Sequence, residues 1–166
     1  MRKTVVDGSS VSGFQRTVQI GSNGYIEGDF GKIDIATVML EEDAATPLNK
    51  GNGTIEYRLD RLGIPLIELA TSSGINSPEQ AKEVAEYIGL LLRSTYVVYG
   101  IGSIRQDINI SIKEGARVEI KGFQELEKIP SVVENEVKRQ VSLLEIKNEL
   151  KKRGFKLDRN KIIALA

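Results

Sequence analysis

Residues 104–121 read Ile-Arg-Gln-Asp-Ile-Asn-Ile-Ser-Ile-Lys-Glu-Gly-Ala-Arg-Val-Glu-Ile-Lys, and polar and apolar side chains alternate along both halves of this stretch. Successive side chains of a β-strand point to opposite faces, so a period of two predicts two strands. Residues 113–116, Lys-Glu-Gly-Ala, separate the halves and have the composition of a turn. The stretch therefore predicts a β-hairpin with one apolar and one polar face.

The polar face of this hairpin combines acids, bases and an amide. Its members are Arg105, Asp107, Asn109 and Ser111 on the first arm and Arg117, Glu119 and Lys121 on the second. If the apolar faces of the two arms coincide, Asp107 lies opposite Lys121, Asn109 opposite Glu119 and Ser111 opposite Arg117. The polar face is then either a solvated side of an antiparallel sheet or a site for a metal and a phosphate together. Both interpretations are open from these residues alone.

Composition limits the chemistry that the chain can perform. At 166 residues it is long enough for one domain with a core, and 23 Lys plus Arg balance 23 Asp plus Glu, so no overall charge attracts nucleic acid. The absence of cysteine and histidine excludes disulfides, imidazole or thiolate metal sites, and histidine-dependent nucleophiles. A bound metal would have oxygen ligands, which favours Mg²⁺, Mn²⁺ or Ca²⁺. No apolar run approaches the about 18 residues of a membrane helix, so we expect a cytoplasmic protein.

The first half of the chain predicts short strands separated by turns. We expect a loop over residues 1–15, strands at 17–20, 25–27, 31–40 and 54–60, turns at Ser22-Asn23-Gly24 and Gly28-Asp29, and a flexible connection at 46–53. Asn23-Gly24 is the strongest hairpin signal in the chain.

Acidic residues follow or interrupt two of these apolar segments. Glu41, Glu42 and Asp43 come where a strand ends, and adjacent strand residues such as Glu41 and Glu42 point to opposite faces. These acids are either an exposed turn or part of a site. Glu68 lies within the apolar run 64–70, where a buried carboxylate would require a cation. That cation is either a lysine or arginine, or a divalent metal.

Two helices are predicted in the second half. Ser77-Pro78-Glu79-Gln80 has the pattern of a helix start, and an apolar stripe continues to about Arg93. A longer helix is expected from Pro130 to Arg153, with Gly154 as its stop. Its predicted inner face is Val133, Val137, Val141, Leu144 and Leu150, and its basic outer face is Lys138, Arg139, Lys147, Lys151, Lys152 and Arg153.

A series of blocks along the chain indicates a family. The blocks are residues 2–9 and 12–17, Leu-Glu-Glu-Asp-Ala at 40–44, Asp-Arg-Leu-Gly-Ile-Pro-Leu-Ile-Glu at 60–68, residues 102–111, and Arg-Val-Glu-Ile-Lys-Gly at 117–122. In this order they resemble the family formed by the B and E subunits of aspartyl/glutamyl-tRNA amidotransferases. The likeness to the archaeal E-type members is greater than to the bacterial B-type members.

The resemblance implies a function and a fold. The family member uses ATP and Mg²⁺ to phosphorylate the γ-carboxylate of glutamate mischarged on tRNA(Gln), and replaces the phosphate with ammonia. The implied partners are the asparaginase-like D-type subunit as ammonia donor and the charged tRNA, in a hetero-oligomer with no membrane. The implied fold is α+β, an antiparallel sheet backed by helices and similar to the glutamine synthetase and guanidino kinase core. Residues 1–166 would be a single domain, part of the catalytic domain.

The resemblance also implies site residues. By resemblance, Glu41, Glu42, Glu68 and Glu119 match the family's acidic metal ligands. The hairpin geometry adds four roles of our own inference: Arg105 and Lys121 could contact phosphate, and Asp107 and Asn109 could orient ligands or water.

The chain also departs from the family. The family carries an N-terminal metal-site segment with Glu and His, and this chain has no histidine. The synthetase-like insertion and the C-terminal helical and tail domains are missing as well. We therefore expect the isolated chain to be catalytically incompetent, and full turnover in an amidation assay would contradict this expectation.

Two other functions fit the same residues. One is a scaffold or tRNA-binding module whose basic helix contacts phosphates, and such binding weakens steeply with salt. The other is a different ATP-dependent carboxylate-amine ligase on the same fold, which only substrate tests can separate from the amidotransferase.

Overall fold

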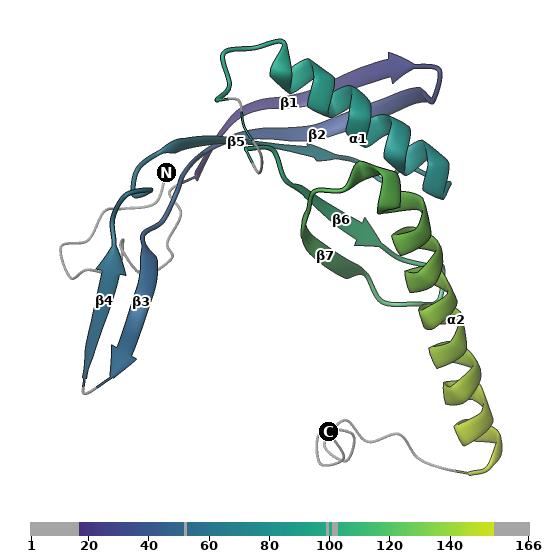
Figure 1. The fold of residues 1–166 in the computed structure, drawn as a ribbon. Helices are drawn as coiled ribbons and strands as arrows, with labels where there is room; N and C mark the ends of the chain where they lie inside the picture. Colours follow the sequence, from purple (N-terminus) through teal and green to yellow (C-terminus); the bar gives the residue numbers. More distant parts are fainter. Residues whose placement is uncertain (1–16, 52, 99, 101–102, 155–166) are drawn as a thin grey trace. The chain divides into compact units, whose positions relative to one another are not determined.

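A computed structural model describes residues 17–51, 53–98, 100 and 103–154. The chain divides into two compact units, Met1–Ile75 and Asn76–Ala166, and each is described here by itself. Unit 1 holds the strands β1 to β5, and unit 2 holds two helices and the strands β6 and β7 (Figure 1). Whether the two units form the single expected domain stays a prediction. The loop predicted at 1–15 lies outside the described residues.

The main sheet of unit 1 has three antiparallel strands. Strands β1 (Thr17–Gly28) and β5 (Pro65–Thr71) flank β2 (Gly31–Glu42), which lies between them (Figure 1). The side chains of Ile26, Ile33 and Ile35 are buried in this unit. Ile33 and Ile35 are two residues apart in β2 and so share a face, and Ile33 pairs with Ile26 of β1. The alternation in the sequence thus places these isoleucines in the core of the sheet.

The predicted turn at Ser22-Asn23-Gly24 is wrong. Strand β1 runs through these residues, because Ser22 pairs with Thr37 and Gly24 pairs with Ile35. Asn23 does adopt the left-handed conformation that the Asn-Gly signal predicts, with a φ of 56°. Because strand pairing continues on both sides of Asn23, this conformation causes a local irregularity in β1 and not a reversal of the chain. The reversal lies between the paired Gly28 and Gly31, at Asp29 and Phe30, one residue beyond the second predicted turn.

The predicted flexible connection at 46–53 is also wrong. Strand β3 (Thr46–Gly51) pairs with β4 (Thr54–Arg58) in a separate two-stranded sheet. The side chain of Asn49 donates a hydrogen bond to Glu56 Oε2 at 2.8 Å across this pair. The register of the β3–β4 pair shifts between Pro47 and Asn49, and Pro47 has no N–H to donate.

Unit 2 confirms both predicted helices to within one residue. Helix α1 (Pro78–Arg93) begins after Ser77, whose Oγ accepts a hydrogen bond from the Gln80 N–H at 3.1 Å. The 3₁₀ turn η2 (Leu126–Lys128) leads into α2 (Ile129–Lys152), and Gly154 has a φ of 79° just past its end. Such a glycine accommodates the left-handed turn that ends many helices.

The predicted hairpin of unit 2 is present as β6 (Gln106–Ile110) and β7 (Val118–Phe123). Buried residues of this unit include Val84, Ile110 and Ile129. A polar side chain ties the hairpin to α2. Gln140, only 4% exposed, donates to the carbonyl of Ile110 at 3.3 Å and accepts from the N–H of Ile112 at 3.3 Å.

The inner face predicted for α2 is therefore wrong in part. Val141 is 42% exposed, whereas the buried positions of the helix are Ile129, Glu136 and Gln140. Gln140 also donates to Glu136 Oε1 at 2.8 Å, so the two buried polar side chains satisfy each other.

All the sheets in the described ranges are antiparallel, and they occur with two helices, as an α+β fold requires. The relation to the glutamine synthetase and guanidino kinase core stays a prediction. No helix in the described part of the chain has the length and apolar character to cross a membrane.

Candidate functional site

The hairpin of β6 and β7 presents its polar residues to solvent, as its alternation predicts. Asp107, Asn109, Glu119 and Lys121 are exposed, whereas Ile110 on the other face is buried. Asn109 pairs with Glu119, which confirms that part of the predicted register. Ser111 and Arg117 lie just beyond the strand ends at Ile110 and Val118, so the prediction that they lie opposite each other is not tested by a ladder pair and stays a prediction.

A bulge next to Asp107 modifies the predicted pairing with Lys121. The register shifts between Gln106 and Ile108, and the Asp107 carboxylate accepts a hydrogen bond from the N–H of Gly122 at 2.7 Å. Gly122 has a φ of 65°, a conformation that glycine adopts without steric cost. The bulge brings two residues of β7 opposite Asp107 and anchors its carboxylate at the backbone.

Lys121 lies between two carboxylates of this face. Its Nζ is 3.1 Å from Glu119 Oε2 and 3.7 Å from Asp107 Oδ2. The hydrogen bond with Glu119, and then the negative charges of Glu119 and Asp107, raise the pKa of Lys121 above its usual range. Lys121, which is predicted to contact phosphate, is thus ion-paired with Glu119, which is predicted to be a metal ligand. Lys121 is 72% exposed, so its ammonium group remains accessible to a phosphate.

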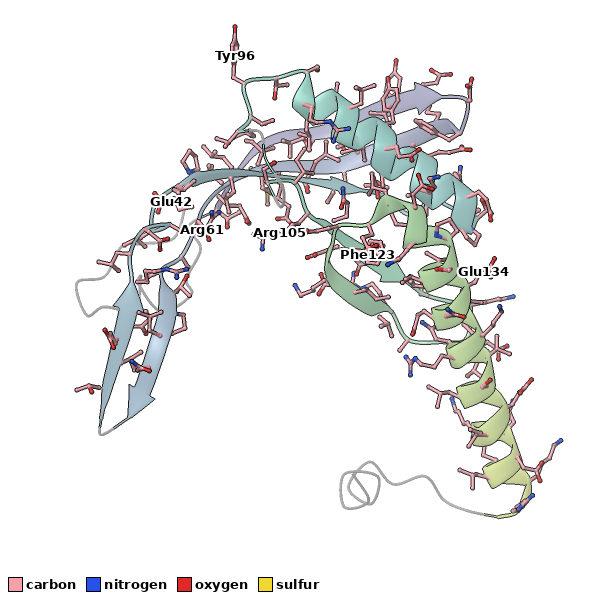
Figure 2. The ribbon with its side chains drawn as sticks, in the orientation of Figure 1. Glu42, Arg61, Tyr96, Arg105, Phe123 and Glu134 are labelled. Atoms are coloured by element: carbon pink, nitrogen blue, oxygen red, sulfur yellow. The ribbon has the colours of Figure 1, made fainter. Side chains whose placement is uncertain are left out.

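Arg105 comes just before β6 and is exposed (Figure 2). Within unit 2, the hairpin thus provides the cations and carboxylates that the sequence predicts for this face.

The acids of unit 1 lie on a pair of neighbouring strands. Glu41 and Glu42 are the last residues of β2, and Glu68 is in the middle of β5. Glu41 pairs with Leu66 and Met39 pairs with Glu68, so the register puts Glu41 and Glu68 on one face of the sheet and Glu42 on the other. The expectation that adjacent acids point to opposite faces agrees with this register. Thr17 Oγ1 donates a hydrogen bond to Glu41 Oε1 at 3.2 Å.

Glu68 is exposed, so the predicted burial of its carboxylate is wrong, and a cation partner no longer follows from burial. The prediction of burial rested on the apolar run 64–70 around Glu68. In the described sheet β5 is an edge strand paired only with β2, and Ile67 and Glu68 both reach solvent. An exposed carboxylate keeps its hydration, so the desolvation argument no longer applies.

Asp43, which the sequence alone leaves as part of either an exposed turn or a site, is paired with Arg61. Arg61 Nε donates to Asp43 Oδ2 at 2.6 Å, and the N–H of Ala44 donates to Asp43 Oδ1 at 2.9 Å. The signal that could have identified this pair is the occurrence of Asp43 and Arg61 in two of the family-like blocks. Their contact depends on the pairing of β2 with β5, which no local pattern reports.

The carboxylates fit Mg²⁺ in kind, since hard cations prefer oxygen ligands. Among residues 17–51, 53–98, 100 and 103–154, no group of three or more acidic side chains is close enough to hold a metal. Mg²⁺ in nucleotide sites is usually bound by one or two carboxylates together with phosphates and water. Glu41 and Glu68 are diagonal neighbours on one face of the sheet, an arrangement that allows two carboxylates to be near each other. A metal site that joins all four glutamates stays a prediction.

The basic outer face predicted for α2 is partly neutralised. Lys138 is paired with Glu134 at 3.4 Å, Arg139 with Glu136 at 2.7 Å, and Arg153 with Glu149 at 2.8 Å. Hydrogen bonds from Arg139 and Gln140 lower the pKa of Glu136 to about 2, so this carboxylate is charged at neutral pH. The pairing weakens the case for a helix that binds tRNA phosphates.

Comparisons with known proteins agree with the family resemblance of the sequence blocks. The sequence model of a family described as the GatB/GatE catalytic domain matches residues 1–165. The chain is similar to proteins named as the E subunit of glutamyl-tRNA(Gln) amidotransferase, with 58% identity over 157 residues in Thermococcus sibiricus and 57% over 157 residues in Pyrococcus abyssi. The protein of the same name from Archaeoglobus fulgidus is 53% identical over 159 residues.

These alignments cover 94%, 94% and 95% of this chain, respectively. They cover only 25%, 25% and 26% of the relatives, so the chain spans about a quarter of their length.

Proposed function

The chain belongs to the GatB/GatE catalytic domain family, and from this premise we propose that it contributes the phosphorylating centre of a tRNA-dependent amidotransferase. The substrate would be glutamate esterified to tRNA(Gln). ATP would phosphorylate its γ-carboxylate, and ammonia from an asparaginase-like partner protein would displace the phosphate to give glutaminyl-tRNA. The observation that carries this proposal is the match of residues 1–165 to the family.

The chemistry of the reaction suits the residues of this chain. A carboxylate is a poor acceptor for ammonia, and transfer of a phosphoryl group converts it into an acyl phosphate with a good leaving group. Phosphoryl transfer requires positioning and charge neutralisation more than covalent catalysis by the protein. A chain without histidine or cysteine can meet those requirements with carboxylates, lysine and arginine.

The acidic residues would hold the metal in this scheme. When bound, Mg²⁺ would neutralise the nucleotide phosphates. Glu41 and Glu68 are the first candidates to hold it, because they share a face of the main sheet. The family resemblance alone implies Glu42 and Glu119 as ligands, and the register puts Glu42 on the face opposite to Glu41 and Glu68.

The hairpin residues would act on the phosphates. Lys121 and Arg105 would contact them and stabilise the charge that develops during transfer. Asp107 would keep Lys121 in place, through the 3.7 Å contact with its ammonium group and its own bond to Gly122. Asn109, which pairs with Glu119, would orient that carboxylate or a water molecule.

The proposal is tested with Glu41→Gln and Glu68→Gln in the complete protein, assayed with its partner proteins, Glu-tRNA(Gln), ATP and Mg²⁺. We expect each variant to lose at least about 100-fold in the release of ADP that depends on Glu-tRNA, because a ligand is lost where charge develops. Isothermal calorimetry should show weakened Mg²⁺ binding. Glu56→Gln serves as the matched control, since Glu56 is bonded to Asn49 in the β3–β4 hairpin. Wild-type turnover and Mg²⁺ affinity in both test variants would refute the assignment.

A further inference from the structure

Asp43 adds to the attachment between the end of β2 and the start of β5. Its N–H donates to the carbonyl of Ile64 at 2.8 Å, and its carbonyl accepts from the N–H of Gly63 at 3.0 Å. These bonds extend the β2–β5 pairing by one position beyond Glu42 and Pro65. The backbone of Asp43 therefore holds the acidic end of one strand against the entry to the next.

The side chain of Asp43 completes this attachment. One carboxylate oxygen accepts from the N–H of Ala44 at 2.9 Å, and the other accepts from Arg61 Nε at 2.6 Å. The Asp43 side chain is 17% exposed, whereas that of Arg61 is 47% exposed. Both oxygens of Asp43 are thus engaged, and its charge is balanced by Arg61. This arrangement suits a residue that positions its neighbours better than one that binds a metal itself.

The segment that Asp43 contacts is a compact turn. The N–H of Leu62 donates to the carbonyl of Leu59 at 3.1 Å, and the N–H of Ile64 donates to that of Arg61 at 3.2 Å. Gly63 has a φ of 81°, which a residue with a side chain rarely adopts. The turn ends directly at Pro65, the first residue of β5, so its position sets the start of the strand that carries Glu68.

The pairing of Asp43 with Arg61 also reduces the repulsion between acidic side chains at the end of β2. Glu41, Glu42 and Asp43 are three adjacent acids, and their mutual repulsion disfavours an ordered chain. The guanidinium of Arg61, in the turn before β5, neutralises one of these charges, that of Asp43. Glu42 and Arg61 lie at the same end of β2 (Figure 2).

We propose that Asp43 and Arg61 are a positioning pair that sets Glu41 and Glu68 relative to each other for the binding of Mg²⁺ with nucleotide. Neither residue touches the metal in this proposal. The proposal rests on the function proposed above, in which Glu41 and Glu68 are metal ligands. Partners that orient metal ligands commonly change metal affinity by about 10- to 100-fold when they are removed.

The test uses Arg61→Met and Arg61→Lys in the complete protein, with Arg58→Met as the matched control. Arg58 is a neighbouring arginine whose Nε is 2.9 Å from Asp60, and its removal leaves Asp43 unchanged. We expect Arg61→Met to weaken Mg²⁺ binding by about 10-fold in calorimetry, and to raise the apparent KM for Mg²⁺ by a similar factor. At saturating Mg²⁺, kcat should stay within about 2-fold of wild type, because excess Mg²⁺ fills the weakened metal site. Arg61→Lys should recover part of the affinity, and Arg58→Met should match wild type.

Two further measurements separate positioning from stability. Hydrogen exchange should speed up at the amides of Asp43 and Gly63 in Arg61→Met, because their bonds join the strand to the turn. A lowered Tm with wild-type affinity and KM for Mg²⁺ would mean that the pair is only structural and would overturn the proposal. If Glu41→Gln and Glu68→Gln lose Mg²⁺ binding while both Arg61 variants keep it, the positioning pair is wrong and the function stands. If the two glutamate variants also bind Mg²⁺ as wild type does, the proposed function itself fails.

Discussion

Gln140 is the residue whose replacement tests the packing of unit 2 most directly. It is 4% exposed and joins α2 to the β6–β7 hairpin through the carbonyl of Ile110 and the N–H of Ile112. Leucine has a similar size and a good helix propensity but no polar atoms. Gln140→Leu would therefore keep the volume and leave those two backbone groups without their partner.

The magnitude follows from these bonds. A buried backbone group that loses its partner costs about 1–3 kcal/mol. Both distances are 3.3 Å, which is long for such bonds and favours the low end of that range. Two backbone groups at about 1 kcal/mol each give a loss of at least about 2 kcal/mol in the free energy of unfolding, because the bond that Gln140 donates to Glu136 is lost as well. In a domain of this size that loss corresponds to a decrease in Tm of about 4–8 °C.

The assay is thermal and urea denaturation, with hydrogen exchange as the local measurement. Ile112 should exchange its amide proton faster in Gln140→Leu, since its acceptor is gone. Asn148→Leu, at an exposed position of the same helix, is the matched control and should change stability by less than about 0.5 kcal/mol. If Gln140→Leu is as stable as that control, or if Ile112 keeps its protection, the view that this side chain anchors the hairpin is refuted.

Two other predictions concern the same region. Gly115→Ala should destabilise the protein by more than about 1 kcal/mol in urea denaturation, because an added Cβ would clash with Gln140 Oε1 and with Ile112 Cγ1 at 2.7 Å. Gly51→Ala, where a Cβ meets nothing within 4 Å, is its control, and equal losses in both variants would contradict the packing. The second prediction concerns pH. The pKa of Glu136 is lowered in the folded state to about 2, so its contribution to stability is present above its unfolded pKa and is lost as pH falls from about 4.5 towards 2. Glu136→Gln should flatten the acid side of the stability curve over that range, and an unchanged acid slope would count against the Arg139 and Gln140 contacts as its cause.

Features set by neighbours in the chain were predicted well. The start of α1 depends on the Oγ of Ser77, the N–H of Gln80 and the fixed φ of Pro78, all within one turn. The two faces of the β6–β7 hairpin depend on the alternation of side chains, and so does the opposite orientation of Glu41 and Glu42 in β2. Such patterns act over a few residues, so they can be read without knowing what lies across from them.

Features that depend on pairing were missed or predicted wrongly. Asn23-Gly24 is a strong turn signal, yet Thr37 and Ile35 pair on either side of Asn23 and keep β1 continuous. Glu68 was expected to be buried, and the edge position of β5 exposes it. The register also puts Glu68 on the face of Glu41 and not on that of Glu42, which depends on the pairing of Met39 with Glu68.

By itself, the sequence determined the family, the residue types available for chemistry, the helices and the polar face of the central hairpin. These properties come from covalent order and short-range sterics, which are the same in every conformation of the chain. The tertiary structure decided that Gln140 is a buried anchor, that Asp43 meets Arg61, and that Lys121 lies between Glu119 and Asp107. Gln140 joins a helix to a strand, Lys121 and Asp107 join two strands, and Asp43 and Arg61 join the residue after β2 to the turn before β5. The free energy of these contacts exists only once folding has brought the two partners together.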